Sequence, residues 1–234
     1  MRPSFYERPV LEVARDLIGC VVAHGGCSGV IVECEAYHDS EPACHAFVGL
    51  TARTATLFGP PGRAYVYRSY GIHALLNAVC EPEGVGAAVL IRALEPVEGI
   101  ELMRARRGVD RVQALCSGPG KLTQALGIEL SHNGGDLARG PVVFSPRPRA
   151  WRDVEVVLDR RVGITKAAEL PWRFLAAGSR FVSRPARPPL AAADAGAARA
   201  AARARAGARA GGSSRARAGA GARGGAGGAS GARA

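Results

Sequence analysis

The sequence predicts a mixed fold in which α-helices accompany antiparallel β-strands. Two strand pairs, near residues 20–37 and 64–79, are each joined by a short turn-forming stretch, which is typical of β-hairpins. Apolar residues recur at helical spacing before the first pair, and a second helical stretch follows the later strands. The chain has 234 residues, 47% of them hydrophobic, which is enough to bury the core of one domain or at most two.

The first predicted elements are a helix and a hairpin. Residues 10–18 carry apolar side chains at helical spacing, and Gly19 is placed to end the helix. The runs 20–23 and 29–37 flank the stretch HGGCS and predict two paired strands. Because side chains alternate along a strand, the second strand should carry Ile31, Glu33, Glu35 and Tyr37 on one face and Val32, Cys34 and Ala36 on the other.

Further turns, strands and helices follow along the chain. The GPPG stretch at 59–62 is a turn, and 64–79 predict two strands with a tight connection at 68–71. Residues 87–96 predict a buried strand that carries Arg92 and ends at Pro96, and 97–107 predict a helix. A Gly/Pro turn leads into a short helix at Lys121, and segments 154–165 and 172–183 are strand-rich. We expect the ordered part to end near Ser183.

The basic charge of the chain is concentrated at its C-terminal end. The formal net charge is +11, and residues 185–234 hold nine arginines and a single acid, a net charge of +8. This stretch is almost entirely Ala, Gly, Arg and Ser, so it cannot bury enough apolar surface to offset the entropy lost on ordering. We expect a domain at 1–184 and a disordered tail at 185–234. The tail is either a non-specific tether to polyanions or a low-complexity extension without a selected role.

The cysteines and the N-terminus indicate the compartment. Six cysteines are scattered without a C-x-x-C motif, and most lie in apolar or strand-like runs, where Cys behaves as a small hydrophobe. The N-terminal stretch lacks an uninterrupted apolar run after a basic start, so neither a signal peptide nor a membrane span is indicated. We expect a cytoplasmic protein in a reducing environment, nucleoid-associated if bacterial and not secreted.

Two carboxylates on the predicted strand 29–37 indicate a site. Glu33 and Glu35 should face the same way and repel each other, which a purely structural sheet rarely tolerates without a nearby cation. Arg92 is the candidate cation, and Tyr37 and His45 suggest the walls of a pocket. The competing interpretation is a solvated strand face.

Other motifs carry weaker signals. Oxygen and nitrogen ligands gather within residues 33–45, but their spacing matches no zinc motif, so we expect no metal. The stretch SGPGKL lacks Walker A spacing; it either aims backbone N–H groups at a DNA phosphate beside Lys121 or simply starts a helix. Tyr70 buries nothing within its own hairpin. It either folds back on the core or wedges into a base stack, with Arg68 beside it for phosphate.

From about residue 14 to residue 183 the chain carries an ordered series of sequence blocks: ARDLIGCVV, VECEAY, PACHAF, FGPPGRAYVYRSYGIH, LIRALEPVEG, LCSGPGKLTQAL, RVGI, WRF and GSRFVS. Together they carry a resemblance to the alkyladenine (3-methyladenine) DNA glycosylases, which are monofunctional base-excision repair enzymes. It implies the α+β class, with a single mixed domain around a curved antiparallel sheet and a protruding β-hairpin that enters the DNA minor groove. It also implies a monomer that acts, without a cofactor, on double-stranded DNA containing alkylated or deaminated purines.

The resemblance further implies roles for particular residues. Glu35 would be the general base that activates water, and it would stabilise the positive charge that develops on the sugar. Glu33 would support the strand or pair with an arginine, whereas we expect Asp39 and Glu41 to be solvated in a loop. Arg92 and the main chain of Val162 would hold the water. Tyr37 and His45 would sandwich the flipped base, and Tyr67 would close the pocket. Asn77 would exclude the 2-amino group of guanine, and Tyr70 would intercalate into the duplex.

Two other function classes compete with this one. A non-catalytic basic nucleic-acid-binding protein would use the tail and the hairpin and would need no buried Glu35, and a metal-dependent hydrolase would use the acidic cluster. Lyase chemistry is disfavoured because it needs an amine nucleophile, and neither Lys121 nor Lys166 lies in a pocket-lining block. The chain departs from the family pattern in a shorter 37–45 loop, in Leu57 where methionine is usual and in lacking bulkier residues before Asn77. The pocket shape and the preferred damaged purine therefore stay open.

Overall fold

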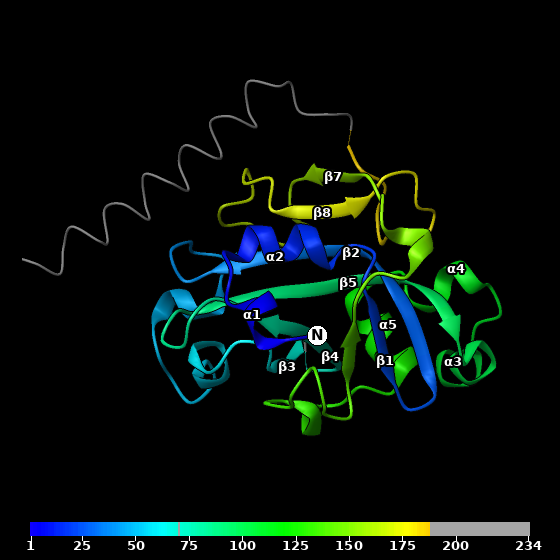
Figure 1. Cartoon of the computed structure of the whole chain (residues 1–234), viewed down its shortest axis with the longest axis horizontal. Helices are drawn as coiled ribbons and strands as arrows, with labels where there is room; N and C mark the ends of the chain where they lie inside the picture. Colours follow the sequence, from blue (N-terminus) through cyan, green and yellow to red (C-terminus); the bar gives the residue numbers. More distant parts are fainter. Residues whose placement is uncertain (70, 188–234) are drawn as a thin grey trace, which may run out of the picture. The chain divides into compact units, whose positions relative to one another are not determined.

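The structure is a computed structural model that describes residues 1–69 and 71–187, and one curved antiparallel sheet forms its centre (Figure 1). Within these residues the sheet has eight strands in the order β3-β4-β5-β2-β1-β6, with β8 paired to β2 and β7 paired to β8. The strands are β1 (Val21–His24), β2 (Cys27–His38), β3 (Ala64–Ser69), β4 (His73–Val79), β5 (Ala87–Glu98), β6 (Val143–Ser145), β7 (Val156–Asp159) and β8 (Arg173–Ala176). The α+β class and both predicted hairpins, β1–β2 and β3–β4, are confirmed.

Short helices cover the sheet. They are α1 (Pro3–Tyr6), α2 (Val10–Leu17), α3 (Ile100–Arg107), α4 (Val112–Leu115) and α5 (Pro119–Leu126), with 3-10 turns η1 (His45–Val48), η2 (Ala55–Phe58), η3 (Leu130–His132) and η4 (Arg149–Trp151). The predicted helix at 10–18 is α2, which packs against β2 through its buried apolar face. The helix ends at Leu17 with Ile18 as its C-cap in an extended conformation, so the prediction that Gly19 ends it is wrong. Gly19 follows at φ +88°, a conformation that favours glycine, and its N–H donates to the Ile31 carbonyl oxygen of β2 at 2.8 Å. Figure 1 shows α3, α4 and α5 gathered at one end of the sheet.

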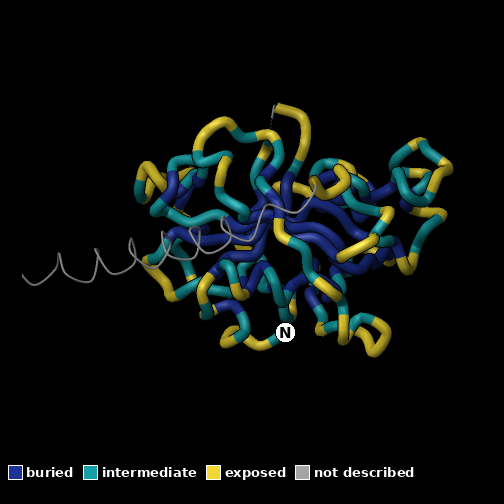
Figure 2. The backbone as a smooth tube through the Cα atoms, turned by 90° about the horizontal axis from the view of Figure 1, so that it is seen from above, coloured by how far each residue is buried: buried dark blue, intermediate teal, exposed yellow. Residues whose placement is uncertain are grey.

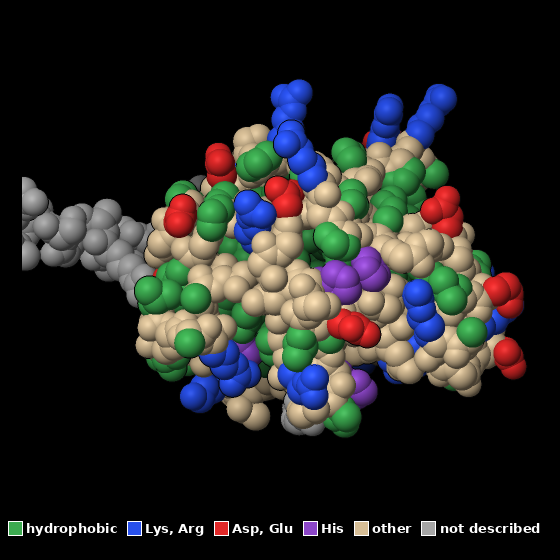
Figure 3. Space-filling view, turned by 90° about the horizontal axis from the view of Figure 1, so that it is seen from below, with side chains coloured by type: hydrophobic (Ala, Val, Ile, Leu, Met, Phe, Trp, Pro, Cys, Tyr) green, Lys and Arg blue, Asp and Glu red, His purple; other side chains and the backbone are tan. Residues whose placement is uncertain are grey.

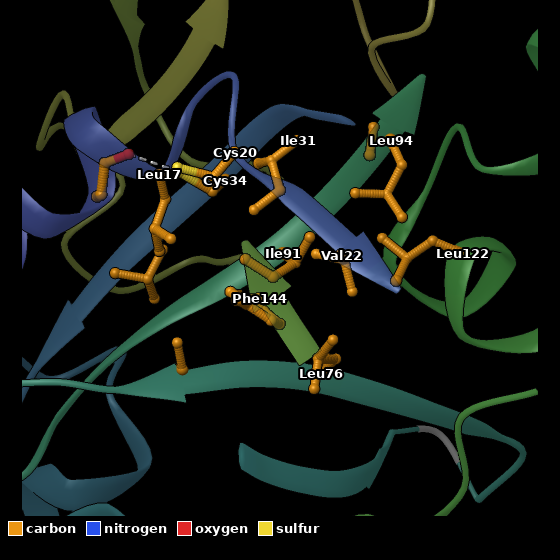
Figure 4. Packing of buried hydrophobic residues seen from close by; sticks show 14 of the residues in the cluster. Leu17, Cys20, Val22, Ile31, Cys34, Leu76, Ile91, Leu94, Leu122 and Phe144 are labelled. Carbon is orange, nitrogen blue, oxygen red and sulfur yellow. Dashed lines mark hydrogen bonds between the residues drawn. The ribbon is translucent and has the colours of Figure 1, made fainter. Parts of the chain in front are cut away.

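Strand β2 has an apolar and a polar side. Its Val32, Cys34 and Ala36 belong to the main hydrophobic core, as the predicted alternation required. Ile31 belongs to the same core, so the prediction that it shares a face with Glu33 is wrong; Figure 4 shows Ile31 and Cys34 among the core side chains. The register between β2 and β5 shifts between Ile31 and Glu33, and this bulge interrupts the two-residue alternation.

All six cysteines are buried and none forms a disulfide. The Cys34 thiol donates a hydrogen bond to the Ala14 carbonyl oxygen at 3.2 Å, and burial raises its pKa well above the ordinary value. Burial likewise raises the pKa of Cys20 to about 11. These protonated side chains act as small core residues, which confirms the interpretation from the sequence.

Strand β5 passes through Pro96 and ends at Glu98, so the prediction that Pro96 ends the strand is wrong. Pro96 lies opposite Gly29 of β2, where the register of the pair is irregular, and a proline without an N–H is tolerated at such a position. A Cβ atom on Gly29 would lie 3.0 Å from both the Glu95 carbonyl oxygen and Leu94 Cβ. A side chain at position 29 would therefore require the neighbouring strand to shift by a few tenths of an ångström.

The β3–β4 hairpin projects its connecting end into solvent. Arg68, Gly71, Ile72 and His73 are exposed, whereas the central residues of β4 are buried in the sheet. Figure 2 shows the same division over the domain, with buried backbone along the strands and exposed backbone in the connections. Tyr70 lies outside the described residues, so its predicted place at the tip is untested.

Hydrogen bonds between the C-terminal segment and the rest of the domain continue beyond Ser183, the residue near which we expected the ordered part to end. Arg173 donates to the Arg184 carbonyl oxygen, and the Arg187 N–H donates to Asp159 Oδ2 at 3.1 Å. The predicted disordered tail lies outside the described residues from 188 onward. In the part of the chain that the structure describes, no helix is long and apolar enough to cross a bilayer.

Replacing Gly29 by alanine should destabilise the fold, because the added methyl group would meet backbone and Cβ atoms that cannot rotate away. We expect a loss of about 1–3 kcal/mol in the free energy of unfolding, the usual range for overpacking, measured by urea denaturation. Gly59→Ala is the matched control, since its nearest contact would be an ordinary 3.4 Å. Equal stability of the two variants would contradict the close approach at Gly29.

Candidate functional site

Three side chains at the middle of the β2–β5 pair form a buried ion cluster. The side chains of Glu33 and Glu35 are fully buried, and Arg92 of β5 lies between them. Arg92 Nε donates to Glu33 Oε1 at 2.9 Å, and Arg92 Nη1 donates to Glu35 Oε2 at 3.2 Å. The expected cation is therefore present, and the alternative of a solvated strand face is excluded.

Glu35 accepts hydrogen bonds on both carboxylate oxygens. The Val162 N–H donates to Oε1 at 2.7 Å, and the Tyr37 hydroxyl donates to Oε2 at 2.9 Å, beside the bond from Arg92. Burial raises the pKa of Glu35 above its ordinary value, although Arg92 and the two hydrogen bonds act in the opposite direction. A carboxylate offers about four lone-pair sites, and three are occupied, so one site on Oε1 stays available to a further donor.

Glu33 belongs to a second layer of charges behind Arg92. Its Oε1 also accepts from Arg173 Nε at 2.8 Å and from the Ser183 hydroxyl at 2.7 Å, and its Oε2 accepts from the Ser183 N–H. Arg173 Nη1 in turn donates to Asp159 at 3.0 Å. Glu33 is thus paired with two arginines, which confirms the expectation of an arginine partner. Arg173 and Asp159 were not among the residues predicted from the sequence. Each is a charged residue within an apolar strand run, and this pattern could have indicated a buried ion pair.

An aromatic cavity of about 260 Å³ opens beside this cluster. Among the predicted site residues it brings together Tyr37, His45, Tyr67, Arg68 and Asn77, and it adds Ala43, Cys44, Arg53, Leu57, Tyr65, Ser69, Ala88, Gly163 and Ile164. Glu35 lies just behind its wall, since Tyr37 and the Val162–Gly163 backbone connect the carboxylate to the cavity. Lys121 is exposed on α5 and does not line it.

Three rings form one wall of the cavity. Tyr65 and Tyr67 stack with their centroids 5.3 Å apart, and the His45 ring meets Tyr67 edge-on at 4.6 Å. His45 Nδ1 lies 3.2 Å from the Tyr65 hydroxyl oxygen. Burial, with a smaller effect from the Arg53 charge, lowers the pKa of His45, which keeps the ring neutral at neutral pH. Tyr65 could have been found from the sequence, because it precedes Tyr67 by two residues on one strand and so shares its face.

Asn77 is buried at the floor of the same cavity. Its Nδ2 donates to the Tyr65 carbonyl oxygen at 3.0 Å, across the β3–β4 pair. This bond fixes the orientation of the amide. Arg68, by contrast, is exposed and reaches the Gly71 carbonyl oxygen at 3.4 Å, at the outer end of the hairpin.

The prediction that Asp39 and Glu41 are solvated is wrong. Glu41 is buried, with 1% of its surface exposed, and both of its oxygens accept from Arg161 at 2.7 and 2.9 Å. Asp39 is partly buried, and its Oδ2 accepts from the Gly86 N–H at 3.3 Å. The counter-charge of Glu41 lies 120 residues away along the chain, so the residues next to Glu41 hold no sign of it.

No group of three or more His, Cys, Asp or Glu side chains among residues 1–69 and 71–187 is arranged to hold a metal ion. Three of the acids that suggested such a cluster, Glu33, Glu35 and Glu41, are instead paired with arginines. The side chains of these three acids are therefore engaged in ion pairs.

Comparison with known proteins identifies the family of the chain. The family described as Methylpurine-DNA glycosylase (MPG) matches residues 4–180. Relatives named 3-methyladenine DNA glycosylase include one from Rhodopseudomonas palustris (strain HaA2), 56% identical over 185 residues, which cover 79% of this chain and 90% of the relative. Others come from Bradyrhizobium diazoefficiens, 56% identical with 79% and 91% covered, and from Methanoculleus marisnigri, 53% identical with 77% and 97% covered. The chain belongs to the methylpurine-DNA glycosylase family.

Proposed function

We propose that this protein is a monofunctional DNA glycosylase that flips a damaged purine out of the duplex and hydrolyses its N-glycosidic bond with water activated by Glu35. The observation that carries the proposal is a buried glutamate held by three donors directly behind an aromatic cavity, in a chain of this family. At about 260 Å³ the cavity is smaller than typical sites for drug-sized ligands, about 300–1,000 Å³, and suits a single nucleobase. Tyr37 and His45 supply the rings that sandwich the base, and Tyr67 closes the pocket.

The charges around Glu35 suit a reaction in which the sugar becomes positive. The connected cluster holds three carboxylates, Glu33, Glu35 and Asp159, against the guanidinium groups of Arg92 and Arg173. One formal negative charge is left over, and Glu35 is the member nearest the cavity. This anion stabilises the oxocarbenium-like sugar, and the free lone-pair site on Oε1 accepts a proton from water. The pKa raised by burial makes Glu35 a stronger base than an exposed glutamate.

The cavity supports water rather than an amine as the nucleophile. The two lysines of the chain are Lys121, exposed on α5, and Lys166, exposed in the connection before β8. Neither lines the cavity, so no lysine is placed to form a Schiff base. Because one chain supplies every proposed site residue, a monomer suffices for the reaction.

For DNA contact we propose Arg68 beside the cavity and Lys121 on α5, both exposed. Figure 3 shows one face of the domain on which Lys and Arg side chains are dispersed among uncharged and acidic ones, without forming a continuous band. Phosphate contacts of this kind position a duplex without reading its sequence, which suits an enzyme that searches for lesions. We propose Tyr70 as the wedge that fills the gap left by the flipped nucleotide.

Incubation of a duplex containing hypoxanthine or 3-methyladenine, followed by alkali and gel electrophoresis, tests this function. Strand cleavage that needs the alkali step is expected, together with the free purine base in the supernatant. Cleavage without alkali would indicate a lyase. Tight DNA binding with no base released from any damaged duplex would instead favour the non-catalytic binder.

Glu35→Gln should abolish excision while leaving affinity for an abasic-site duplex nearly unchanged. The amide keeps the shape of the side chain but cannot take a proton, and loss of a general base costs about 10²–10⁴-fold in rate. Single-turnover kinetics and fluorescence anisotropy measure the two quantities. A variant that keeps more than a tenth of the wild-type rate would show that Glu35 is not the base.

The single-turnover rate should fall on the acid side as Glu35 becomes protonated. Burial raises its pKa, so the midpoint of this fall should lie above 4.5, the ordinary value. Tyr37→Phe keeps the ring but removes a hydrogen bond that lowers this pKa, so its acid limb should move to still higher pH. A midpoint at or below 4.5, or the same limb in both proteins, contradicts the assignment.

Asn77→Ser should allow release of some undamaged guanine. The shorter side chain leaves room for the 2-amino group and removes the amide that is fixed by the Tyr65 carbonyl oxygen. Mass analysis of bases released from undamaged DNA measures the effect, and retained excision of hypoxanthine serves as the control for folding. Guanine at the wild-type background would remove Asn77 from this role.

A further inference from the structure

Arg161 lies behind the cavity wall and is in contact with two rings. It follows β7, its side chain is fully buried, and its guanidinium carbon lies 4.6 Å from the Tyr37 ring centroid and 5.3 Å from that of Trp172. Tyr37 also lines the cavity. A guanidinium packed on a ring attracts it electrostatically and, when buried, restricts where the ring can move.

Hydrogen bonds hold this guanidinium from several segments. Nη1 donates to the Ala36 carbonyl oxygen at 3.0 Å and to Glu41 Oε1 at 2.7 Å. Nη2 donates to Glu41 Oε2 at 2.9 Å and to the Ala167 carbonyl oxygen at 3.3 Å. The bidentate pair with Glu41 offsets the cost of burying both charges and fixes the plane of the guanidinium.

The residues that follow Arg161 contact Glu35 and line the cavity. The Val162 N–H donates to Glu35 Oε1 at 2.7 Å, and Gly163 and Ile164 line the cavity. This stretch lies in an irregular connection between β7 and β8, without strand pairing to hold it. The Arg161 side chain ties the connection to the Ala36 carbonyl oxygen of β2 and to Glu41, beside the bonds that Val162 makes with Glu35 and Arg92.

We propose, resting on the function proposed above, that Arg161 is a positioning residue that sets both the Tyr37 ring and the Val162 N–H in the geometry needed for excision. Errors of about 1 Å in such geometry cost on the order of 10²-fold in rate. The competing explanation is that Arg161 only neutralises the buried Glu41. The two explanations differ in what happens when both charges are removed together.

The decisive experiment compares Arg161→Met, Glu41→Gln and the double variant. Arg161→Met alone leaves Glu41 buried without its partner and should lose stability. In the double variant neither charge of the Arg161–Glu41 pair remains, and the glutamine amide oxygen can still accept from the Ala43 N–H, which in the wild type donates to Glu41 Oε2. The melting temperature of the double variant should recover toward wild type, whereas its single-turnover rate on a hypoxanthine duplex should stay about 10–100-fold lower.

Two further measurements distinguish a loss of positioning at the site from a general loss of folding. Affinity for an abasic-site duplex should change less than about twofold, because that ligand has no base to stack. The acid limb of the rate should move to higher pH in the double variant, since the Val162 hydrogen bond lowers the pKa of Glu35. Arg147→Met is the control: Arg147 donates to the Ile18 and Arg15 carbonyl oxygens, and none of these three residues lines the cavity. Its loss should lower stability without moving this limb.

A double variant with the wild-type rate and the wild-type acid limb would overturn the proposal. If the double variant does not fold, Arg161→Lys replaces it: lysine keeps the charge for Glu41 but not the planar fork, and a folded Arg161→Lys with the wild-type rate would equally overturn the proposal. The same assay on the wild-type protein distinguishes failure of this inference from failure of the proposed function on which it rests. Base release by wild type leaves the function standing whatever the variants do, and its absence removes both.

Discussion

The structure of the site depends on Arg92, which lies between two buried carboxylates on the neighbouring antiparallel strand. Glu33 and Glu35 project from the same side of β2, and without a cation their charges would repel each other in a poorly solvated interior. Arg92 of β5 bonds to both. The register between β2 and β5 therefore sets the relative positions of these three side chains. The longest strand pair of the sheet thus holds the ion cluster of the candidate site.

The C-terminal part of the chain completes what the hairpins begin. Arg173 and Ser183 donate hydrogen bonds to Glu33, and Asp159 pairs with Arg173. Val162, in the connection between β7 and β8, contributes an N–H to Glu35. Segments separated by more than a hundred residues along the chain thus meet at these two carboxylates of β2.

The aromatic cavity and the ion cluster are joined through Tyr37. One side chain lines the cavity, donates to Glu35 and packs on Arg161. A base stacked on this ring would therefore lie in a fixed relation to Glu35. Burial raises the pKa of Glu35 and lowers that of His45. The cause is the same for both side chains, because the uncharged form of each is favoured away from water.

Local signals in the sequence were enough to predict the hairpins, the α2 helix and a pocket beside Glu35 with Tyr37 and His45 in its walls, because strand alternation is read within short stretches of chain. The family resemblance added Tyr67 and Asn77, which also line this cavity. Other features follow from contacts between distant segments. Glu41 is buried because Arg161 arrives from far along the chain, Ile31 turns into the core because a bulge shifts the register, and Pro96 continues a strand because Gly29 faces it. Each depends on which distant backbone becomes the neighbour, and charge compensation and close approach exist only once the chain has folded.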